Sequence, residues 1–337
     1  MYNNFLILTF FIIFNFFIII FFEKINFFHR NIDTPDSKRK LHKKPVALAG
    51  GSILFLNLIF YFFLTFSNII IIDEEIIFSN NTNLILFFIT CLSIFVVGFV
   101  DDGLNLSASI KFIIITVLII FILYWDNELN INFIKFSFFK TGFDLAEFSM
   151  LFTCFCFLVF LNSFNMFDGI NLQSCTYSII MLLSILFFYI DTILIKILIL
   201  SLVSYGYLNF TNKSFLGDSG SLLISFVIGY IFIKIYNLDI IQFSDEIVIY
   251  MLIPGLDLIR LFFKRLVLKR NPLSPDRFHL HHLLLLKFSY YKTLIIINSL
   301  ILFPILLNFL NFEKKYIIFL TILIYSLLIK KIHKQSL

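Results

Sequence analysis

Acidic, amide and imidazole side chains gather in four short clusters of an otherwise apolar chain. The clusters are Asp101-Asp102, Asn162-x-x-Asn165-x-x-Asp168-Gly169, Gly217-Asp218-x-Gly220-Ser221 and His279-x-His281-His282. Carboxylate oxygens bind hard divalent cations such as Mg²⁺, and glycine-rich turns let backbone N–H groups approach an anion. Polar groups at the edge of a bilayer are costly, so they usually mark chemistry or transport. The combination predicts chemistry on phosphate groups.

Three carboxylates are candidates for binding a metal ion. Asp101 and Asp102 end an apolar run, where two negative charges oppose a helix macrodipole that favours cations. A bound divalent cation would relieve that repulsion, and a solvated loop start is the alternative interpretation. Asp218 lies between two glycines before another apolar run. It can hold a hard cation there or serve as an ordinary helix N-cap.

The amide cluster predicts a polar stripe on one helix. Asn162, Asn165 and Asp168 are spaced three apart, so on a helix they share one face, and Gly169 would end that helix. Two amides and a carboxylate suit a nucleobase, a ribose or a hydrated metal ion. A stripe whose members are satisfied between packed helices is the alternative interpretation.

The three histidines follow a basic segment that includes Arg277. Imidazoles among guanidinium groups suit phosphate oxygens. Zinc is an alternative ligand, but no cysteine lies near His279, His281 and His282, and the carboxylates elsewhere prefer Mg²⁺. A surface loop without function is the third interpretation.

Other polar groups have simpler explanations. Asp257 and Arg260 lie three apart in an apolar segment and can pair on one helix face, which favours a structural role over a catalytic one. The run Lys38-Arg39-Lys40-Leu41-His42-Lys43-Lys44 could set membrane topology or bind anionic lipids. The four cysteines lie in or near apolar segments without metal-like spacing, as buried small hydrophobic residues do.

The elements that must position these clusters are membrane helices. The 337 residues are 60% hydrophobic and only 14% charged, whereas a soluble domain is about a quarter charged. Eleven apolar runs approach the roughly 20 residues that a bilayer core requires. They centre on residues 5–22, 47–66, 83–100, 108–125, 148–166, 175–190, 192–210, 220–236, 246–263, 293–311 and 315–330. We expect an all-α, polytopic integral membrane bundle of about 11 transmembrane helices, in one domain over residues 1–337.

The basic residues predict the orientation of this bundle. If the spans alternate, 18 of the 26 lysines and arginines fall in loops or at span ends on one side and four on the other. Because basic loops stay in the cytoplasm, the N-terminus is predicted outside and the C-terminus in the cytoplasm. All four clusters then share the cytoplasmic side with the first basic loop. The cytoplasmic loops cover about 23–46, 101–107, 162–174, 211–220 and 264–292.

Carboxylates, basic loops and glycine-rich turns on one membrane face favour phosphoryl transfer at the lipid–water boundary. A lipid flippase or ion-coupled transporter is the alternative. Transporters place their binding groups near the midplane and often contain repeats, whereas here the acidic groups lie at span ends and no repeat is visible. A purely structural membrane protein leaves the segregation of the clusters unexplained.

In their order along the chain, these motifs resemble those of the polyprenyl-phosphate N-acetylhexosamine-1-phosphate transferases, glycosyltransferase family 4. The resemblance is to the undecaprenyl-phosphate GlcNAc-1-phosphate transferase branch, a relative of the phospho-MurNAc-pentapeptide translocase. The eleven spans, the outside N-terminus and the His-Leu-His-His form also look like this branch. The matching stretches are Asp33-Thr-Pro-Asp-Ser-Lys-Arg-Lys-Leu-His42 with Gly50-Gly51, Gly98-x-x-Asp101-Asp102, Asn162-Ser-Phe-Asn165-Met-Phe-Asp168-Gly169, Phe215-Leu-Gly217-Asp218-Ser-Gly220-Ser221 and Pro275-Asp276-Arg277-x-His279-Leu-His281-His282.

The resemblance implies transfer of N-acetylhexosamine 1-phosphate, with GlcNAc as the first candidate, from a UDP-sugar to undecaprenyl phosphate with release of UMP. It implies Mg²⁺, or Mn²⁺ in its place, and a role at the bacterial inner membrane in starting a lipid-linked envelope glycan such as O-antigen. The bilayer is a partner, nucleic acid is not, and a homodimer is left open. By match, Asp101, Asp102, Asp168, His281 and His282 would be catalytic, and Asp218, Asp102 and Asp101 would hold the metal. Lys38, Arg39, His42, Asn162, Asn165, Asn171, Arg277 and His279 would contact the nucleotide or its diphosphate.

One departure from the family pattern concerns the nucleotide. After Asp168-Gly169-Ile170 the family commonly continues Asp-Gly-Leu, whereas this chain has Asn171-Leu172-Gln173. The position of Asn171 is implicated in uracil recognition in the related peptidoglycan branch. Asn171 can still hydrogen-bond a pyrimidine edge, but it carries no charge. The sugar is left open between GlcNAc and a 6-deoxy N-acetylhexosamine.

Overall fold

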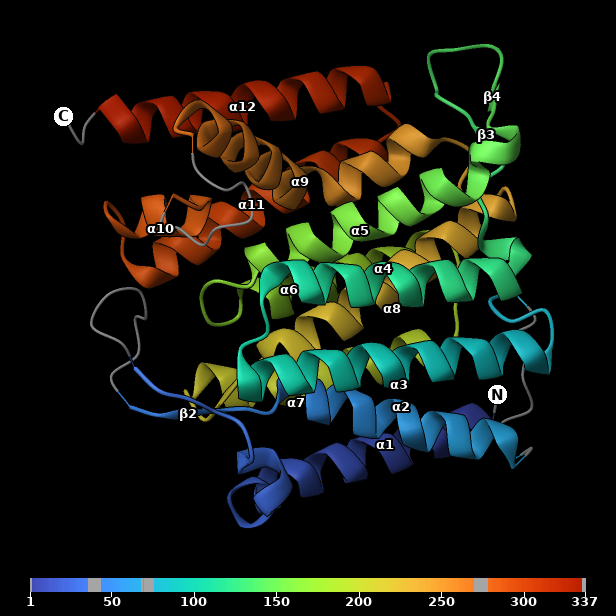
Figure 1. The fold of residues 1–337 in the computed structure, drawn as a ribbon, viewed down its shortest axis with the longest axis vertical. Helices are drawn as coiled ribbons and strands as arrows, with labels where there is room; N and C mark the ends of the chain where they lie inside the picture. The colour runs from blue at the N-terminus through green and yellow to red at the C-terminus, as the bar shows by residue number, and fades with distance from the viewer. Residues whose placement is uncertain (1, 36–43, 68, 70–75, 270–277, 335–337) are drawn as a thin grey trace.

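The structure is a computed structural model that describes residues 2–35, 44–67, 69, 76–269 and 278–334. Its long helices lie side by side along one direction, and successive helices run back and forth across the molecule (Figure 1). The first begins at one end of the bundle and the last finishes at the other. They are α1 (Tyr2–Phe21), α2 (Gly50–Phe66), α3 (Asn81–Leu104), α4 (Ala108–Trp125), α5 (Ser149–Phe167), α6 (Gln173–Phe188), α7 (Ile193–Phe210), α8 (Gly217–Asn237), α9 (Ser244–Val267), α11 (Tyr290–Phe309) and α12 (Lys314–Lys334).

Each predicted span corresponds to one of these helices. Seven described helices are long and apolar enough to cross a membrane, namely α1, α3, α4, α5, α7, α8 and α11. The apolar helices α2 and α6 are shorter, with 17 and 16 residues. A helical membrane protein is therefore confirmed, while eleven crossings and the direction of the termini stay predictions.

Helix boundaries differ from the predicted runs where polar residues form local structure. Helix α2 begins at Gly50, not at residue 47, because Val46–Leu48 pairs as a strand. Helix α3 continues through both aspartates to Leu104, and α8 already begins at Gly217. The three predicted metal ligands thus lie in terminal helical turns rather than in loops. A short helix, α10 (Leu280–Leu285), carries two of the histidines where a loop was expected.

Several helices begin at a side chain that satisfies a free backbone N–H group. The side chain of Asn80 accepts from Asn83 N at 2.8 Å before α3. Ser107 does the same for α4. Such N-caps are each worth about 1 kcal/mol. Helix α3 ends at Leu104, and the C-cap residue Asn105 has a left-handed φ of 52°, a conformation that asparagine tolerates better than most residues.

Helix α8 is the centre of the bundle. Its apolar stretch is 100% buried, against 22% for α4, and it packs against α2, α3 and α5. Two glycines allow the closest approaches. A Cβ on Gly98 of α3 would lie 2.4 Å from Ser219 Cα, and one on Gly51 of α2 would lie 2.5 Å from Gly220 N. Small residues let helix backbones approach closely, so the first turn of α8 is held between α2 and α3.

Short strands and 3₁₀ turns occupy some connections. Strand β2 (Val46–Leu48) pairs antiparallel with β1 (Ile32–Asp33) and parallel with β5 (Ser214–Phe215). The segment before α2 is thereby tied to the segment before α8. Strands β3 (Phe133–Ile134) and β4 (Phe143–Asp144) form a hairpin at the opposite end (Figure 1). The 3₁₀ turns are Phe22–Lys24, Asn26–His29, Asn127–Leu129 and Ala146–Phe148.

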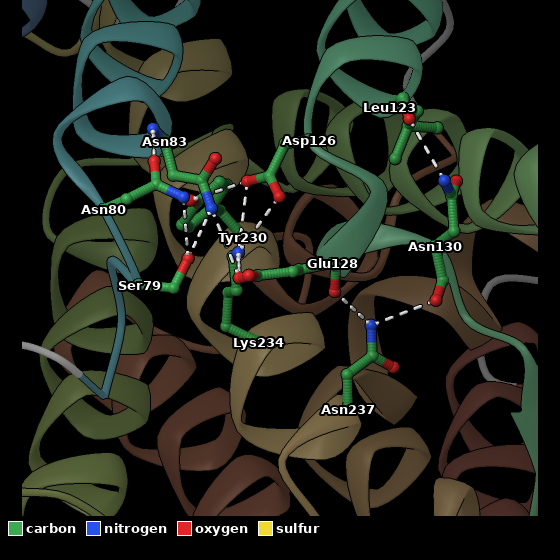
Figure 2. A network of polar contacts seen from close by, with 10 residues as sticks. All are labelled: Ser79, Asn80, Asn83, Leu123, Asp126, Glu128, Asn130, Tyr230, Lys234 and Asn237. Atoms are coloured by element: carbon green, nitrogen blue, oxygen red, sulfur yellow. Dashed lines mark hydrogen bonds and ion pairs between the residues drawn. The ribbon is translucent and has the colours of Figure 1, made fainter.

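A buried ion-pair network anchors the far end of α8 (Figure 2). Lys234 is 2% exposed, and its Nζ lies 3.1 Å from Asp126 Oδ2 and 2.8 Å from Glu128 Oε2. The hydroxyl of Tyr230 donates to Asp126 at 3.2 Å. A buried charge is tolerated only when it is paired and hydrogen-bonded. These contacts join the end of α4 and the turn after it to the last turns of α8.

Candidate active site

The four polar clusters, far apart in sequence, meet at one end of the bundle. The end of α3 contacts the start of α8 through Asp102, and the end of α5 contacts α8 through Asn165, whose Nδ2 donates to Ser221 Oγ at 2.8 Å. Gly169, just after α5, lies directly against the ring of His281. Figure 1 shows β2 and α10 at this same end. We call it the site end.

Asp102 holds the N-terminus of α8 from the neighbouring helix. Its Oδ1 accepts from Asp218 N at 2.7 Å, and its Oδ2 accepts from Ser219 N at 3.1 Å and from Ser219 Oγ at 2.7 Å. A Cβ on Gly217 would lie 2.6 Å from this carboxylate, at a φ of +73° that favours glycine. A helix N-terminus favours a negative charge. Both oxygens of Asp102 therefore contact protein donors.

The ammonium group of Lys111 lies between Asp101 and Asp218. Lys111 Nζ is 2.8 Å from Asp101 Oδ2 and also pairs with Asp218 Oδ2. The other oxygen of Asp101 accepts from Leu106 N at 2.7 Å. Carboxylates from α3 and α8 thus contact one cationic group that α4 supplies.

This pair of carboxylates fits a hard divalent cation. Within the described part of the chain, no group of three or more His, Cys, Asp or Glu side chains could hold a metal ion. Mg²⁺, however, is commonly held by one or two carboxylates together with substrate phosphates and water. The ammonium group of Lys111 contacts an oxygen of Asp101 and an oxygen of Asp218, so the two carboxylates lie close enough for one cation to contact both.

The amide cluster lines the end of α5. Asn162 Nδ2 donates to Leu158 O at 2.7 Å within the helix, and Asp168 directly follows the last helical residue. Ser174 Oγ donates to Asp168. Burial raises the pKa of Asp168 to about 7, against this hydrogen bond, and the charge of Asp218 adds to the rise. A carboxyl group that titrates near neutral pH can hold or release a proton during a reaction.

The histidine cluster packs against the end of α5. A Cβ on Gly169 would lie 2.0 Å from His281 Nε2, so the ring requires a glycine there. The rings of His279 and His281 are parallel, with their centroids 5.5 Å apart. The ring centroids of His281 and His282 are 4.3 Å apart. Burial, with the adjoining His282 and His279, holds the pKa of His281 well below its usual range. His281 is therefore neutral at physiological pH.

Asp257 connects the histidine cluster to α9. Its pairing with Arg260 has the predicted spacing, with an Nη2–Oδ1 distance of 2.7 Å. Asp257 Oδ2 also lies 3.0 Å from His279 Nδ1. The sequence interpretation of a structural pair was therefore incomplete, because it left out this contact with the histidine motif.

Asn171 lies in the turn between α5 and α6 and joins two connections at the site end. Its Nδ2 donates to Asn209 O at 2.9 Å and to Asn212 Oδ1 at 2.8 Å. The hydroxyl of Tyr290 donates to its backbone carbonyl at 2.6 Å. Four other predicted contacts, Lys38, Arg39, His42 and Arg277, lie outside the described residues.

Sequence reasoning missed Lys111 and the contacts of Asp257 with His279 and Tyr325. Lys111 is the one charged residue in the apolar run 108–125, and a charge inside a membrane span is a functional candidate by default. That signal could have found it. Tyr325 of α12, which contacts Asp257, carries no such signal, because the two residues are 68 positions apart.

Comparison with known proteins shows which family and which transferases this chain resembles. A model of glycosyl transferase family 4 matches residues 84–236, from α3 to α8. The chain is 26% identical over 300 residues to the undecaprenyl-phosphate alpha-N-acetylglucosaminyl 1-phosphate transferase of Thermotoga maritima, covering 88% of this chain and 87% of that protein. It is 25% identical over 266 residues to the Salmonella typhi protein of that name, covering 75% and 69%. A probable undecaprenyl-phosphate N-acetylglucosaminyl 1-phosphate transferase of Bacillus subtilis is 27% identical over 264 residues, covering 75% and 69%.

Proposed function

This chain belongs to glycosyl transferase family 4, and from that premise we propose that it transfers an N-acetylhexosamine 1-phosphate from a UDP-sugar to undecaprenyl phosphate. GlcNAc is the first candidate for the sugar, since the relatives are named for it. One observation carries the proposal: Asp101 and Asp218 converge on Lys111 beside the amide and histidine clusters. A transporter would place such groups near the midplane, whereas both carboxylates lie in terminal turns of their helices.

The proposed reaction forms one bond and breaks one. An oxygen of undecaprenyl phosphate attacks the β-phosphorus of the UDP-sugar, and the bond from that phosphorus to the bridging oxygen breaks, so that UMP leaves with that oxygen. The attacking phosphate has a second pKa near 6 and is largely dianionic at neutral pH without help. An ordinary aspartate, with a pKa of about 3.9, would be a weak base for it. Positioning and charge neutralisation therefore supply most of the rate.

The charged residues at the site end would have different roles in this reaction. Asp101 and Asp218 would hold Mg²⁺, or Mn²⁺ in its place, which when bound supplies positive charge to the phosphates. Asp102 keeps the first turn of α8, and with it Asp218, in place. Lys111 offers a second positive charge beside both carboxylates.

The amides and imidazoles would recognise the nucleotide sugar. Asn162 and Asn165 would contact the nucleotide. His281 is neutral, so it would bond to the diphosphate as a hydrogen-bond donor rather than as a charge. Asp168, with its pKa near 7, would hold or release a proton at the edge of the site.

We further propose that the site end faces the cytoplasm of a bacterial inner membrane. The support is the distribution of lysines and arginines, because 18 of the 26 fall in loops or at span ends on this side and basic loops stay in the cytoplasm. The product would be the first lipid-linked intermediate of an envelope glycan such as O-antigen. A homodimer stays a prediction.

The proposal is tested by measuring UMP release from a panel of UDP-sugars by the purified protein with undecaprenyl phosphate and Mg²⁺. UDP-GlcNAc or another UDP-N-acetylhexosamine should give UMP, EDTA should stop the reaction, and Mn²⁺ should restore it. Asp218→Asn should lower turnover by orders of magnitude. The matched control is Asp239→Asn at the far end, where the carboxylate is exposed and pairs with Lys135. No UMP from any UDP-N-acetylhexosamine would contradict the proposal.

A further inference from the structure

We propose that the last helix, α12, positions the histidine cluster through a hydrogen-bonded relay from Tyr325 through Asp257 to His279. The three residues come from α12, from α9 and from the residue before α10. They act through other residues and are therefore positioning residues. The inference deepens the proposed function, because the histidines that the relay orients are those assigned to the diphosphate.

Asp257 is the centre of the relay. It is 4% exposed and accepts from four donors. Arg260 Nη2 donates to its Oδ1 at 2.7 Å and Tyr325 OH at 2.8 Å, while His279 Nδ1 lies 3.0 Å from its Oδ2. The backbone N–H of Leu280 contacts both oxygens, at 3.2 and 3.3 Å. A carboxylate whose oxygens are filled by protein donors orients those donors rather than a ligand.

The relay determines where α10 begins and how its imidazoles lie. Leu280 is the first residue of α10, so Asp257 accepts from the N-terminal backbone of that helix. Its contact with His279 Nδ1 fixes the orientation of the first ring. His281 lies parallel to that ring, at an interplanar angle of 5°, and rests on Gly169. A rotation of His279 would therefore disturb His281 and its packing against α5.

Helix α12 holds this arrangement from both sides of α10. Before α10, the hydroxyl of Tyr325 accepts from Arg260 Nε at 2.9 Å and donates to Asp257. Arg260 Nη2 in turn donates to Phe278 O at 2.6 Å. After α10, Lys287 Nζ donates to Ile332 O at 2.6 Å near the end of α12. The segment that carries the histidines is thus linked to the last helix through α9 before α10 and bonded to it directly after α10.

The test removes one oxygen atom from the relay. Tyr325→Phe keeps the ring and deletes the hydroxyl, which leaves Asp257 with one donor fewer. The matched control is Tyr316→Phe on the same helix, where the side chain is 62% exposed. KM and kcat are measured separately for UDP-GlcNAc and for undecaprenyl phosphate. Tyr325→Phe should lower kcat/KM for UDP-GlcNAc about tenfold, as expected for a hydrogen bond to a buried charged group, with the KM for undecaprenyl phosphate unchanged.

A double mutant separates positioning from general weakening of the fold. In a His279→Asn background, where the relay has lost its last member, Tyr325→Phe should cause no further loss of kcat/KM. Equal losses on both substrates, additive losses in the double mutant, or a Tyr325→Phe enzyme within twofold of wild type would each overturn the relay. A wild-type protein that releases no UMP would instead count against the proposed function.

Hydrogen exchange tests the relay without any substrate. The amides of residues 280–285 should exchange several-fold faster in Tyr325→Phe than in wild type, because α10 loses part of the support at its first residue. In Tyr316→Phe they should exchange as in wild type. Unchanged exchange in Tyr325→Phe would show that the relay does not support α10.

Discussion

Gly98 in α3 is a position where a single added methyl group should displace the backbone of the site. A Cβ there would lie 2.4 Å from Ser219 Cα, 2.5 Å from Ser219 N and 2.7 Å from Asp218 C. All three atoms belong to the backbone of α8, so no side-chain rotation relieves the overlap. Gly98→Ala must therefore push the first turn of α8 away from α3, and Asp218 moves away from Asp101.

The size of the effect follows from these distances. Ordinary contacts of a Cβ atom lie at 3.4–4 Å, so the helices must separate by about 1 Å. Overpacking of this kind costs about 1–3 kcal/mol of stability. A displacement of about 1 Å in a catalytic group costs about 100-fold in rate. We expect Gly98→Ala to fold with reduced stability and to retain about 1% of the turnover.

The matched control is Gly255→Ala in α9, where an added Cβ meets no atom within 4 Å. Alanine is favoured over glycine in a helix by about 1 kcal/mol, so this variant should be as stable as wild type or more stable. Turnover is measured by UMP release. Unfolding is followed with a thiol-reactive dye, since Cys91 and Cys175 are buried and free. Wild-type turnover and unfolding temperature in Gly98→Ala would refute the close contact of α3 with α8.

Three further predictions test other parts of the structure. Lys111→Met should lower the rate of UMP release at least tenfold, because two carboxylates lose the cation between them, and an unchanged rate would remove Lys111 from the site. His281 stays neutral in the folded protein, whereas its imidazole in the unfolded chain takes up a proton below about pH 6.5, which favours the unfolded chain; between pH 7 and pH 5 the unfolding temperature of wild type should therefore fall relative to that of His281→Gln, and a constant difference between the two proteins would contradict the burial of His281. Lys234→Met leaves Asp126 buried without its ion-pair partner and should cost about 3–5 kcal/mol of stability. Lys135→Met at an exposed pair should change the unfolding temperature little, and equal shifts in the two variants would contradict the network.

The helices could be predicted from the sequence because their signal is local. A run such as 108–125 is apolar over the length of a span, and burial in a bilayer leaves a helix as the main solution for its backbone. Alternation of the spans then placed Asp101, Asp168, Asp218 and His281 at one end, where the structure has them.

The contacts within the site could not be predicted in the same way. Whether Lys111 contacts Asp218 depends on the rotation of α4 and α8 about their axes, and helices that are apolar on every side contain little information about rotation. That Asp102 holds the first turn of α8 could not be predicted for a related reason, since its partners are backbone groups of another helix. The short helix α10 has six residues and too little periodicity to stand out.

The central claim is that a sugar leaves its nucleotide together with one phosphate. It is tested most directly with UDP-GlcNAc that carries a radioactive label in its β-phosphate, mixed with purified protein, undecaprenyl phosphate and Mg²⁺. Our account predicts that the label enters the lipid in equal amount to the UMP released, and that Asp218→Asn abolishes both. Label that remains in UDP, or that appears as free sugar phosphate in water, would contradict it.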